Sequence, residues 1–340
     1  MTEMLENRHP IHEADENSLF GSLTPLEFYD RHSVVHSSST FINPQGLEIF
    51  TQSWVPKIPS DEIKGIICMV HGYTGESNWF LQLTSMFFAK SGFSVCALDH
   101  QGHGFSQGLP SHIPDIRPLV TDCVTFFHQF LSKYPSSVPR FLYSESLGGA
   151  IALLIHLTDH SLYLEDPGGI NINTWNGIVL NGAMCGISEK IKPQWPLEHL
   201  LSIAAYLVPT WKIVPTKGTI VDVSFKLEWK RKLAMASPNR KKAAIRPRAA
   251  TALELVRVCK DLQGRFEEIK APLLIIHGSE DILCDPACVQ ELYHRASSND
   301  KTIKIYPGML HQLIGESEED VDLIFGETLQ WLISKTNTNN

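Results

Sequence analysis

The chain alternates between short, mostly apolar runs and longer segments in which apolar residues recur at helical spacing. Short runs of this kind predict strands, and they lie at 63–70, 93–98, 140–143, 176–181, 272–278 and, with polar and apolar residues alternating, 302–306. Between them, residues 77–90 and 116–131 place apolar side chains on one helical face. Strands that alternate with helices form a mostly parallel sheet covered on both faces. The pattern therefore predicts an α/β fold.

Two regions depart from this alternation. Residues 39–54 contain two strand-like segments joined at 43–46, which predicts a hairpin at the edge of the sheet. After the run at 176–181, the next strand does not begin until Pro272, and such a length is too long for a simple crossover. We therefore predict three parts: an N-terminal extension (1–35), a core (36–184 and 267–335) and an inserted helical subdomain (185–266).

A serine lies at the turn between the strand at 140–143 and an apolar helical segment. The motif Ser-Glu-Ser-Leu-Gly-Gly at 144–149 is close to Gly-x-Ser-x-Gly, in which small residues let strand and helix approach while the serine is held in a strained conformation. Gly148 fits the pattern, whereas Ser144 replaces its first glycine. The motif indicates Ser146 as a nucleophile; the alternative is an ordinary serine-rich helix start.

A serine nucleophile needs a histidine base, which in turn needs a carboxylate. Asp281 follows the strand at 272–278, and His311 follows the strand at 302–306. This order of Ser, Asp and His at strand ends is the order found on open sheets that carry such a triad. Asp285 is a rival carboxylate, ranked second because it lies farther from the strand.

An oxyanion hole would complete this chemistry, since charge on the tetrahedral oxygen needs preorganised N–H donors. The strand at 63–70 ends in His-Gly-Tyr-Thr-Gly at 71–75. We expect one donor to be the backbone N–H of Leu147, which follows the nucleophile, and the other to be that of Tyr73. The alternative role for the loop at 71–75 is that of a tight turn.

Five motifs taken together resemble those of the monoacylglycerol lipase family of α/β-hydrolases. The chain is most similar to the plant branch, which includes caffeoylshikimate esterase-like and lysophospholipase-like enzymes. The motifs are His-Gly at 71–72, Asp-His-Gln-Gly-His-Gly at 99–104, the serine motif at 144–149, His-Gly-Ser-Glu-Asp at 277–281 and Gly-Met-Leu-His at 308–311. The resemblance spans roughly residues 40 to 335 and implies an α/β-hydrolase fold whose insertion, residues 185–266, is a cap over the active site.

The resemblance also implies roles for individual residues. Ser146 would be the nucleophile, Asp281 the orienting carboxylate and His311 the base. Tyr73 and Leu147 would be the backbone donors, while Asp99, His100 and His103 would be structural turn residues. No metal and no organic cofactor are expected.

The expected reaction is hydrolysis of a carboxylic ester through an acyl-enzyme. The substrate we expect is a monoacylglycerol or a related lipid, cleaved to fatty acid and glycerol. Caffeoylshikimate and lysophospholipids stay open as alternatives, as do acyl transfer and a receptor that keeps the fold without turnover.

The predicted cap contains two segments of different character. Residues 195–211, which begin at Trp195 and end at Trp211, are apolar and aromatic, consistent with internal packing, an acyl-chain wall or a membrane-touching rim. A basic segment follows, and it is either a solvated face or an attractor for anionic lipid or a charged substrate group. Its members are Lys226, Lys230, Arg231, Lys232, Arg240, Lys241, Lys242, Arg246 and Arg248.

Composition narrows the class of protein. The 340 residues include 43% hydrophobic and 19% charged residues, enough for one large core with an insertion. A net charge of −8 argues against a nucleic-acid partner. Seven scattered cysteines are typical of buried thiols in a reducing compartment.

Acidic residues near the N-terminus and the lack of a long apolar run lead us to expect a cytoplasmic protein. A further expectation is peripheral membrane contact through the cap.

Overall fold

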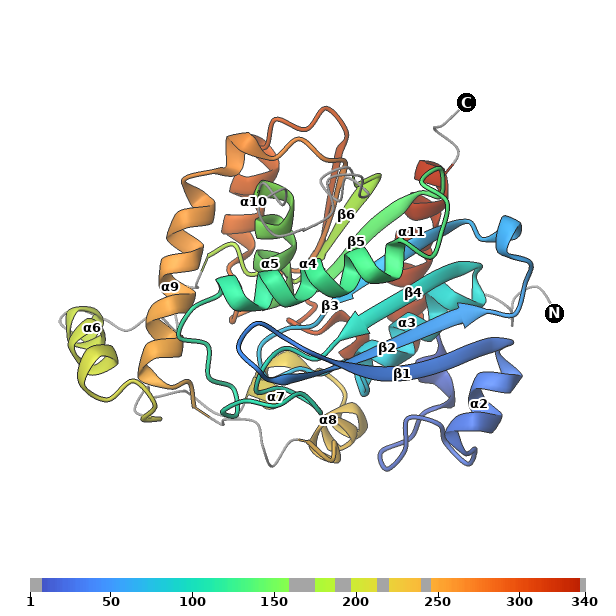
Figure 1. The fold of residues 1–340 in the computed structure, drawn as a ribbon, viewed down its shortest axis with the longest axis horizontal. Helices are drawn as coiled ribbons and strands as arrows, with labels where there is room; N and C mark the ends of the chain where they lie inside the picture. Colours follow the sequence, from blue (N-terminus) through green and yellow to red (C-terminus); the bar gives the residue numbers. More distant parts are fainter. Residues whose placement is uncertain (1–7, 159–174, 187–196, 213–219, 240–245, 337–340) are drawn as a thin grey trace.

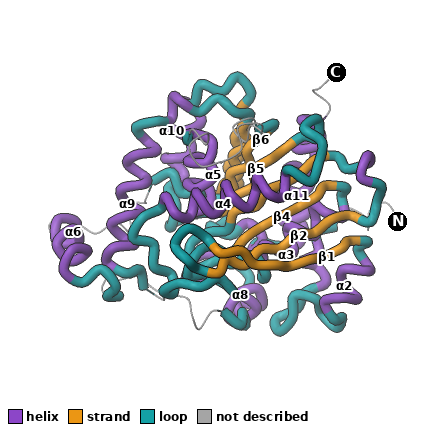
Figure 2. Tube along the Cα trace, viewed as in Figure 1, coloured by secondary structure: helices purple, strands orange, loops and turns teal. Residues whose placement is uncertain are grey.

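A sheet of eight strands forms the centre of the protein (Figures 1 and 2). The computed structural model describes residues 8–158, 175–186, 197–212, 220–239 and 246–336. Within these residues the strands are β1 (Val34–Ile42), β2 (Glu48–Pro56), β3 (Gly65–Val70), β4 (Phe93–Leu98), β5 (Arg140–Glu145), β6 (Gly177–Asn181), β7 (Leu273–Gly278) and β8 (Lys301–Tyr306). Each strand that the sequence pattern predicts is present.

The strands lie in the order β1-β2-β4-β3-β5-β6-β7-β8. β1 pairs antiparallel with β2, and β2 pairs antiparallel with β4, so the predicted hairpin does form the edge of the sheet. All other neighbouring strands are parallel. The carboxyl ends of β3, β5, β7 and β8 therefore meet at one edge, where the predicted site residues lie.

Helices cover both faces of this sheet. Those between or after the core strands are α3 (Phe80–Lys90), α4 (Arg117–Leu131), α5 (Leu147–Leu157), α10 (Pro286–Arg295) and α11 (Glu318–Thr336). α2 (Pro25–Arg31) precedes β1, and the described residues also contain short 3₁₀ turns at Pro10–Glu13, Ser60–Glu62, Phe266–Glu268 and Leu313–Gly315. In Figure 1, α4 and α5 lie on the near face, while α3 and α11 lie behind the sheet.

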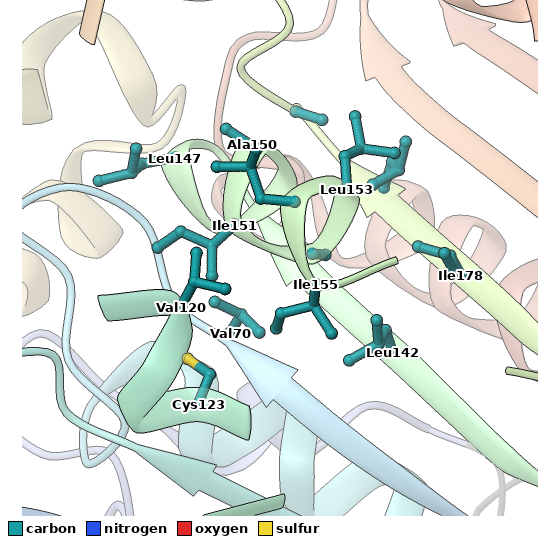
Figure 3. Packing of buried hydrophobic residues seen from close by; sticks show 14 of the residues in the cluster. Val70, Val120, Cys123, Leu142, Leu147, Ala150, Ile151, Leu153, Ile155 and Ile178 are labelled. Carbon is teal, nitrogen blue, oxygen red and sulfur yellow. The ribbon is translucent and has the colours of Figure 1, made fainter. Parts of the chain in front are cut away.

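Successive residues of the central strands point into two separate cores. In β3, Ile66 and Cys68 belong to the cluster beneath α4 and α5, whereas Ile67 and Met69 belong to the cluster on the opposite face. Figure 3 shows Ile151 of α5 close to Val120 of α4 within the first cluster. Because both faces are covered, the parallel strands are buried on both sides and therefore are apolar throughout.

The helix predicted from residue 77 begins three residues later. The backbone N–H of Ser77 donates to Asp99 Oδ1 at 2.6 Å, and the Ser77 hydroxyl accepts from Gln52 Nε2 at 2.7 Å. These two contacts hold Ser77 in the loop after β3, so α3 begins at Phe80. Apolar periodicity could not reveal this boundary, because it depends on a partner from the end of β4.

The segment between β6 and β7 is helical where the structure describes it. It contains α6 (Leu197–Leu207), α7 (Ile220–Ser224), α8 (Glu228–Met235) and α9 (Ala249–Gln263). α6 lies at the outer edge of the molecule, beyond α9 (Figure 1). Trp195 and the basic residues at 240–242 lie outside the described residues.

The basic residues of this segment do not form a single solvated face. Lys230 is fully buried. Lys226 pairs with Glu316, Lys232 pairs with Glu16, and Arg248 donates to the carbonyl oxygens of Pro110 and Thr210. The solvated-face alternative is therefore wrong for Lys230, which is buried, whereas the side chains of Lys226 and Lys232 are about half exposed.

Candidate active site

Ser146 lies at a strained turn between β5 and α5. Its backbone has φ 55° and ψ −121°, a conformation that L-residues rarely adopt. The turn is tight: a Cβ on Gly148 would lie 2.2 Å from the carbonyl oxygen of Val70. Ser144 is fully buried and donates its hydroxyl to Val179 O at 3.0 Å, which explains how serine replaces the first glycine of the motif.

His311 and Asp281 are in direct contact. His311 Nδ1 lies 2.6 Å from Asp281 Oδ2, and both side chains are almost completely buried. Oδ1 of Asp281 accepts the backbone N–H groups of Leu283 at 2.8 Å and Cys284 at 3.0 Å. A carboxylate at this position makes Nδ1 the protonated nitrogen of His311, which leaves Nε2 with a lone pair to accept a proton.

Cys284, which the sequence did not single out, lies beside this pair. Burial raises the pKa of the Cys284 thiol well above its ordinary value, and an interaction with the Ser146 side chain opposes this rise. Ligand atoms of Cys284, Asp281 and His311 all lie within 4.8 Å of one another. The loop after β7 therefore places the predicted carboxylate against the predicted base, and Ser146 follows β5 at the same edge of the sheet.

The electrostatics of this cluster favour an ionised Asp281. Burial raises its pKa, but the charges of His311 and His277, together with their hydrogen bonds, lower it more, and the pKa lies well below its ordinary value. Burial lowers the pKa of His311, while Asp281 and Glu145 raise it, and the net pKa is raised. The carboxylate thus stabilises a protonated His311, as a general base requires.

His277 is a second residue that the sequence analysis passed over. Its Nε2 lies 3.1 Å from Asp281 Oδ2 and 3.1 Å from Cys284 O, so this nitrogen must carry the proton that both oxygens accept. His277 and His311 therefore contact the same oxygen of Asp281, Oδ2. Its position at the end of β7, four residues before Asp281, was the available signal.

The rival carboxylate has another role. Asp285 is the N-cap of α10, and its Oδ1 accepts the backbone N–H of Ala287 at 3.0 Å. Asp99 is likewise structural, since Oδ2 accepts Phe105 N at 2.8 Å and Oδ1 accepts Ser77 N. Each carboxylate is thus occupied by backbone donors, which come from its own turn for Asp285 and from its own turn and the loop after β3 for Asp99.

The loop after β3 lies directly against the turn that carries Ser146. A Cβ on Gly72 would lie 2.8 Å from Ser146 Cβ and 3.4 Å from Ser146 Oγ. The next residue is Tyr73, whose hydroxyl donates to Ser111 O at 3.1 Å and so anchors the loop. Leu147 is the first residue of α5, where a backbone N–H has no partner within the helix. Leu147 therefore directly follows Ser146, and Tyr73 directly follows a glycine that lies against Ser146.

Glu145, which immediately precedes Ser146, is a buried acid. Its Oε1 accepts the Tyr143 hydroxyl at 3.2 Å, and that hydroxyl accepts Asn181 Nδ2 at 2.8 Å. Burial raises the pKa of Glu145 from 4.5 to about 7, opposed by Tyr143 and His311. The folded protein therefore holds this proton more tightly than the unfolded chain does.

We expect Glu145→Gln to remove a pH dependence of stability. Because the pKa of Glu145 is raised in the folded state, its favourable contribution is complete below about pH 4.5 and is lost as the pH rises through about 7. The free energy of unfolding of the variant should match wild type at pH 5 and exceed it by up to about 3 kcal/mol at pH 8. Urea titrations at the two pH values measure this. An equal difference in the free energy of unfolding between variant and wild type at pH 5 and at pH 8 would contradict this prediction.

Asp281, Cys284 and His311 also have the donor types of a metal site. Two observations favour a hydrogen-bonded cluster instead. His311 Nδ1 and Asp281 Oδ2 already bond each other. Burial raises the pKa of Cys284, which keeps the thiol protonated, whereas metal ions bind thiolates. The arrangement is thus suited to moving a proton between a hydroxyl and an imidazole.

Comparisons with known proteins point to the same chemistry. A family profile described as serine aminopeptidase, S33, matches residues 61–318. Caffeoylshikimate esterase of Arabidopsis thaliana is 31% identical over 331 residues, which cover 97% of this chain and 95% of that protein. Human monoglyceride lipase is 25% identical, over 87% of this chain and 90% of its own. A soluble variant of monoglyceride lipase from Saccharomyces cerevisiae, solved with a substrate analog, superposes with a TM-score of 0.74 at 19% identity, covering 88% of this chain and 96% of its own.

Proposed function

Since the chain belongs to the serine aminopeptidase S33 family of α/β-hydrolases and is a carboxylic ester hydrolase, we propose a specific substrate for it. We propose that the protein cleaves monoacylglycerols. Ser146 Oγ attacks the ester carbonyl, and His311 Nε2 takes the proton and returns it to the glycerol oxygen that leaves. Asp281 holds the imidazole, while the N–H groups of Tyr73 and Leu147 stabilise the oxyanion. Water activated by His311 then releases the fatty acid from Ser146.

The observation that carries the choice of a lipid substrate is the outer surface of α6. Four large apolar side chains of α6 are exposed, and Tyr206 and Leu207 are 85% and 68% exposed. The others are Leu200 and Ile203, and Trp211, which lies after the end of α6, is exposed as well. Exposed apolar side chains of this kind on a predicted cap favour contact with a lipid phase over contact with water. Of the three alternatives for residues 195–211, this exposure supports the membrane-touching rim.

We expect loss of this surface to weaken membrane contact selectively. The double variant Tyr206→Ser/Leu207→Asn should bind phosphatidylcholine vesicles at least about 30-fold more weakly in a flotation assay, since burial of each side chain in lipid would contribute about 1–2 kcal/mol to binding. Turnover of a water-soluble short-chain ester should stay unchanged. Leu26→Asn is a matched control, because Leu26 is 69% exposed on α2. Equal binding by all three proteins would exclude α6 as the contact.

Caffeoylshikimate is the second candidate substrate. It is favoured by the 31% identity to the Arabidopsis esterase over nearly the whole chain. Both substrate classes need an apolar slot and a polar head-group site, so the triad does not separate them.

A matched panel tests the proposed function. Initial rates would be measured on a long-chain monoacylglycerol, a lysophospholipid and caffeoylshikimate, with Ser146→Ala as background. Ser146-dependent preference for the monoacylglycerol supports the proposal. Preference for caffeoylshikimate or the lysophospholipid would replace it with that alternative, and product formed with an added acceptor alcohol would reveal acyl transfer.

We also propose that residues 185–266 form a cap on a core of residues 36–184 and 267–335, and that the protein is cytoplasmic. The cap is supported by contacts of α8 with loops after β3 and β8. The location is supported by seven cysteines that are all free thiols. No helix in the described part of the chain combines the length and apolarity needed to cross a bilayer. Recovery in a secretory fraction rather than in cytosol or at membrane surfaces would contradict the proposed location.

A further inference from the structure

A fully buried lysine connects the inserted segment to the loop that carries His311. Lys230 of α8 has no exposed surface. Its Nζ donates to the carbonyl oxygen of Ile314 at 2.8 Å and to that of Glu316 at 2.7 Å. Burial lowers the pKa of Lys230 to about 8, against the opposing effect of nearby carboxylates. A buried cation is costly unless its donors are satisfied, so this contact calls for a role beyond packing.

Further contacts hold the backbone on both sides of His311. The N–H of Leu310 donates to Glu316 Oε1 at 2.7 Å, and the N–H of Gln312 donates to Ser224 O at 3.0 Å. Glu316 is itself fully buried, and its Oε2 lies 3.3 Å from Lys226 Nζ. The residues that flank the predicted base are thus fixed by groups from, or bound to, α7 and α8.

The same segment also holds the loop that carries Tyr73. Trp79 donates its indole N–H to Leu233 O at 2.9 Å. Glu76 Oε2 accepts Asn239 Nδ2 at 2.6 Å, and Glu76 also accepts the Ser237 hydroxyl. α8 and the turn after it therefore contact the loop after β3 on one side and the loop after β8 on the other.

We propose that residues 220–239 act as a brace that fixes the separation between His311 and the oxyanion loop, and that Lys230 and Trp79 are its positioning residues. The loops after β3 and β8 come from non-neighbouring strands, so sheet pairing alone does not set the distance between them. The brace contacts the loop after β8 at backbone atoms and the loop after β3 through the side chains of Trp79 and Glu76. Displacement of a catalytic group by about 1 Å can cost a hundredfold in rate. This inference rests on the catalytic roles of His311 and Tyr73 proposed above.

The first test compares two lysines of α8. Lys230→Met keeps the length and apolar stem but removes both donors, whereas Lys232→Met alters a residue whose side chain is 55% exposed and pairs with Glu16. We expect Lys230→Met to lower kcat about 10- to 100-fold with KM within about threefold, and to slow acylation of Ser146 by a fluorophosphonate probe to the same degree. Lys232→Met should match wild type. A purely structural lysine would lower the free energy of unfolding while leaving the kcat of the folded fraction unchanged.

The second test uses the other end of the brace. Trp79→Phe removes the indole donor but keeps an aromatic ring, and it leaves the buried Lys230 unchanged. It therefore tests the proposed brace even if Lys230→Met fails to fold. We expect Trp79→Phe to slow acylation at least about threefold. In the double variant, the combined loss should be smaller than the product of the single losses by about threefold or more, because both act on one element.

The outcomes separate this inference from the proposed function. Labelling and turnover that persist in Ser146→Ala would overturn the proposed function. Ser146-dependent labelling that is equally fast in wild type, Lys230→Met and Trp79→Phe would overturn the brace alone. Single losses that multiply in the double variant would also overturn it.

Discussion

Ser146→Ala is expected to lose at least about three orders of magnitude in kcat on any ester the protein hydrolyses. Alanine lacks the hydroxyl oxygen that would form the acyl-enzyme, so His311 has no hydroxyl to deprotonate. The fold should persist, because the strained φ of 55° is tolerated in the native protein by contacts of the surrounding turn, such as that of Gly148 with Val70. Rates on a chromogenic ester and labelling by a fluorophosphonate probe measure the effect.

The matched control lies two residues earlier. Ser144→Gly restores the ordinary motif and removes a buried hydrogen bond to Val179 O. It should cost about 1 kcal/mol in the free energy of unfolding and leave kcat within a few-fold of wild type. If Ser144→Gly were inactive and Ser146→Ala active, the nucleophile would be misassigned.

The second large effect is expected for Asp281→Asn, which should lose about three to four orders of magnitude in kcat. The amide can present N–H₂ to His311 Nδ1 and so favour the tautomer in which Nε2 carries the proton and cannot act as base. Loss of the carboxylate charge also removes the main interaction that raises the pKa of His311. The pH profile of any residual kcat/KM should therefore have its acidic limb at lower pH than wild type.

Asp285→Asn is the matched comparison for this prediction. Asp285 caps α10, and asparagine caps a helix as well as aspartate does. Its kcat and its free energy of unfolding should stay close to those of wild type. Normal turnover in Asp281→Asn together with a loss in Asp285→Asn would reverse the two assignments.

Much of the fold follows from local pattern. The alternation of apolar runs with helical segments predicted the parallel strands, the edge hairpin and the long insertion between β6 and β7. These patterns can be recognised in the sequence because each buried strand must be apolar on both faces, whereas each covering helix must be apolar on one face. Helix boundaries that depend on contacts with distant residues could not be predicted from these patterns, as the start of α3 shows.

Some residues of the candidate site could likewise be predicted from the sequence, and others could not. Ser146, Asp281 and His311 could be selected because each follows a strand, and parallel strands bring their carboxyl ends to one edge. The roles of Cys284 and His277 were missed: Cys284 lies in no motif, and the motif at 277–281 contains His277 but does not indicate that it contacts Asp281. Their proximity depends on the path of the loop after β7.

The sequence by itself determined the sheet, the strained serine turn and the order along the chain of the predicted triad residues, because these depend on short-range spacing and on burial of apolar side chains. Only the tertiary structure decided which carboxylate contacts His311 and where the basic residues of the insertion lie. Lys230 is the clearest case: among neighbouring lysines it resembles a surface cation, yet it is buried against carbonyl oxygens from residues more than 80 positions away. The acceptors of a polar side chain are set by how loops from separate strands meet, and no local pattern encodes that.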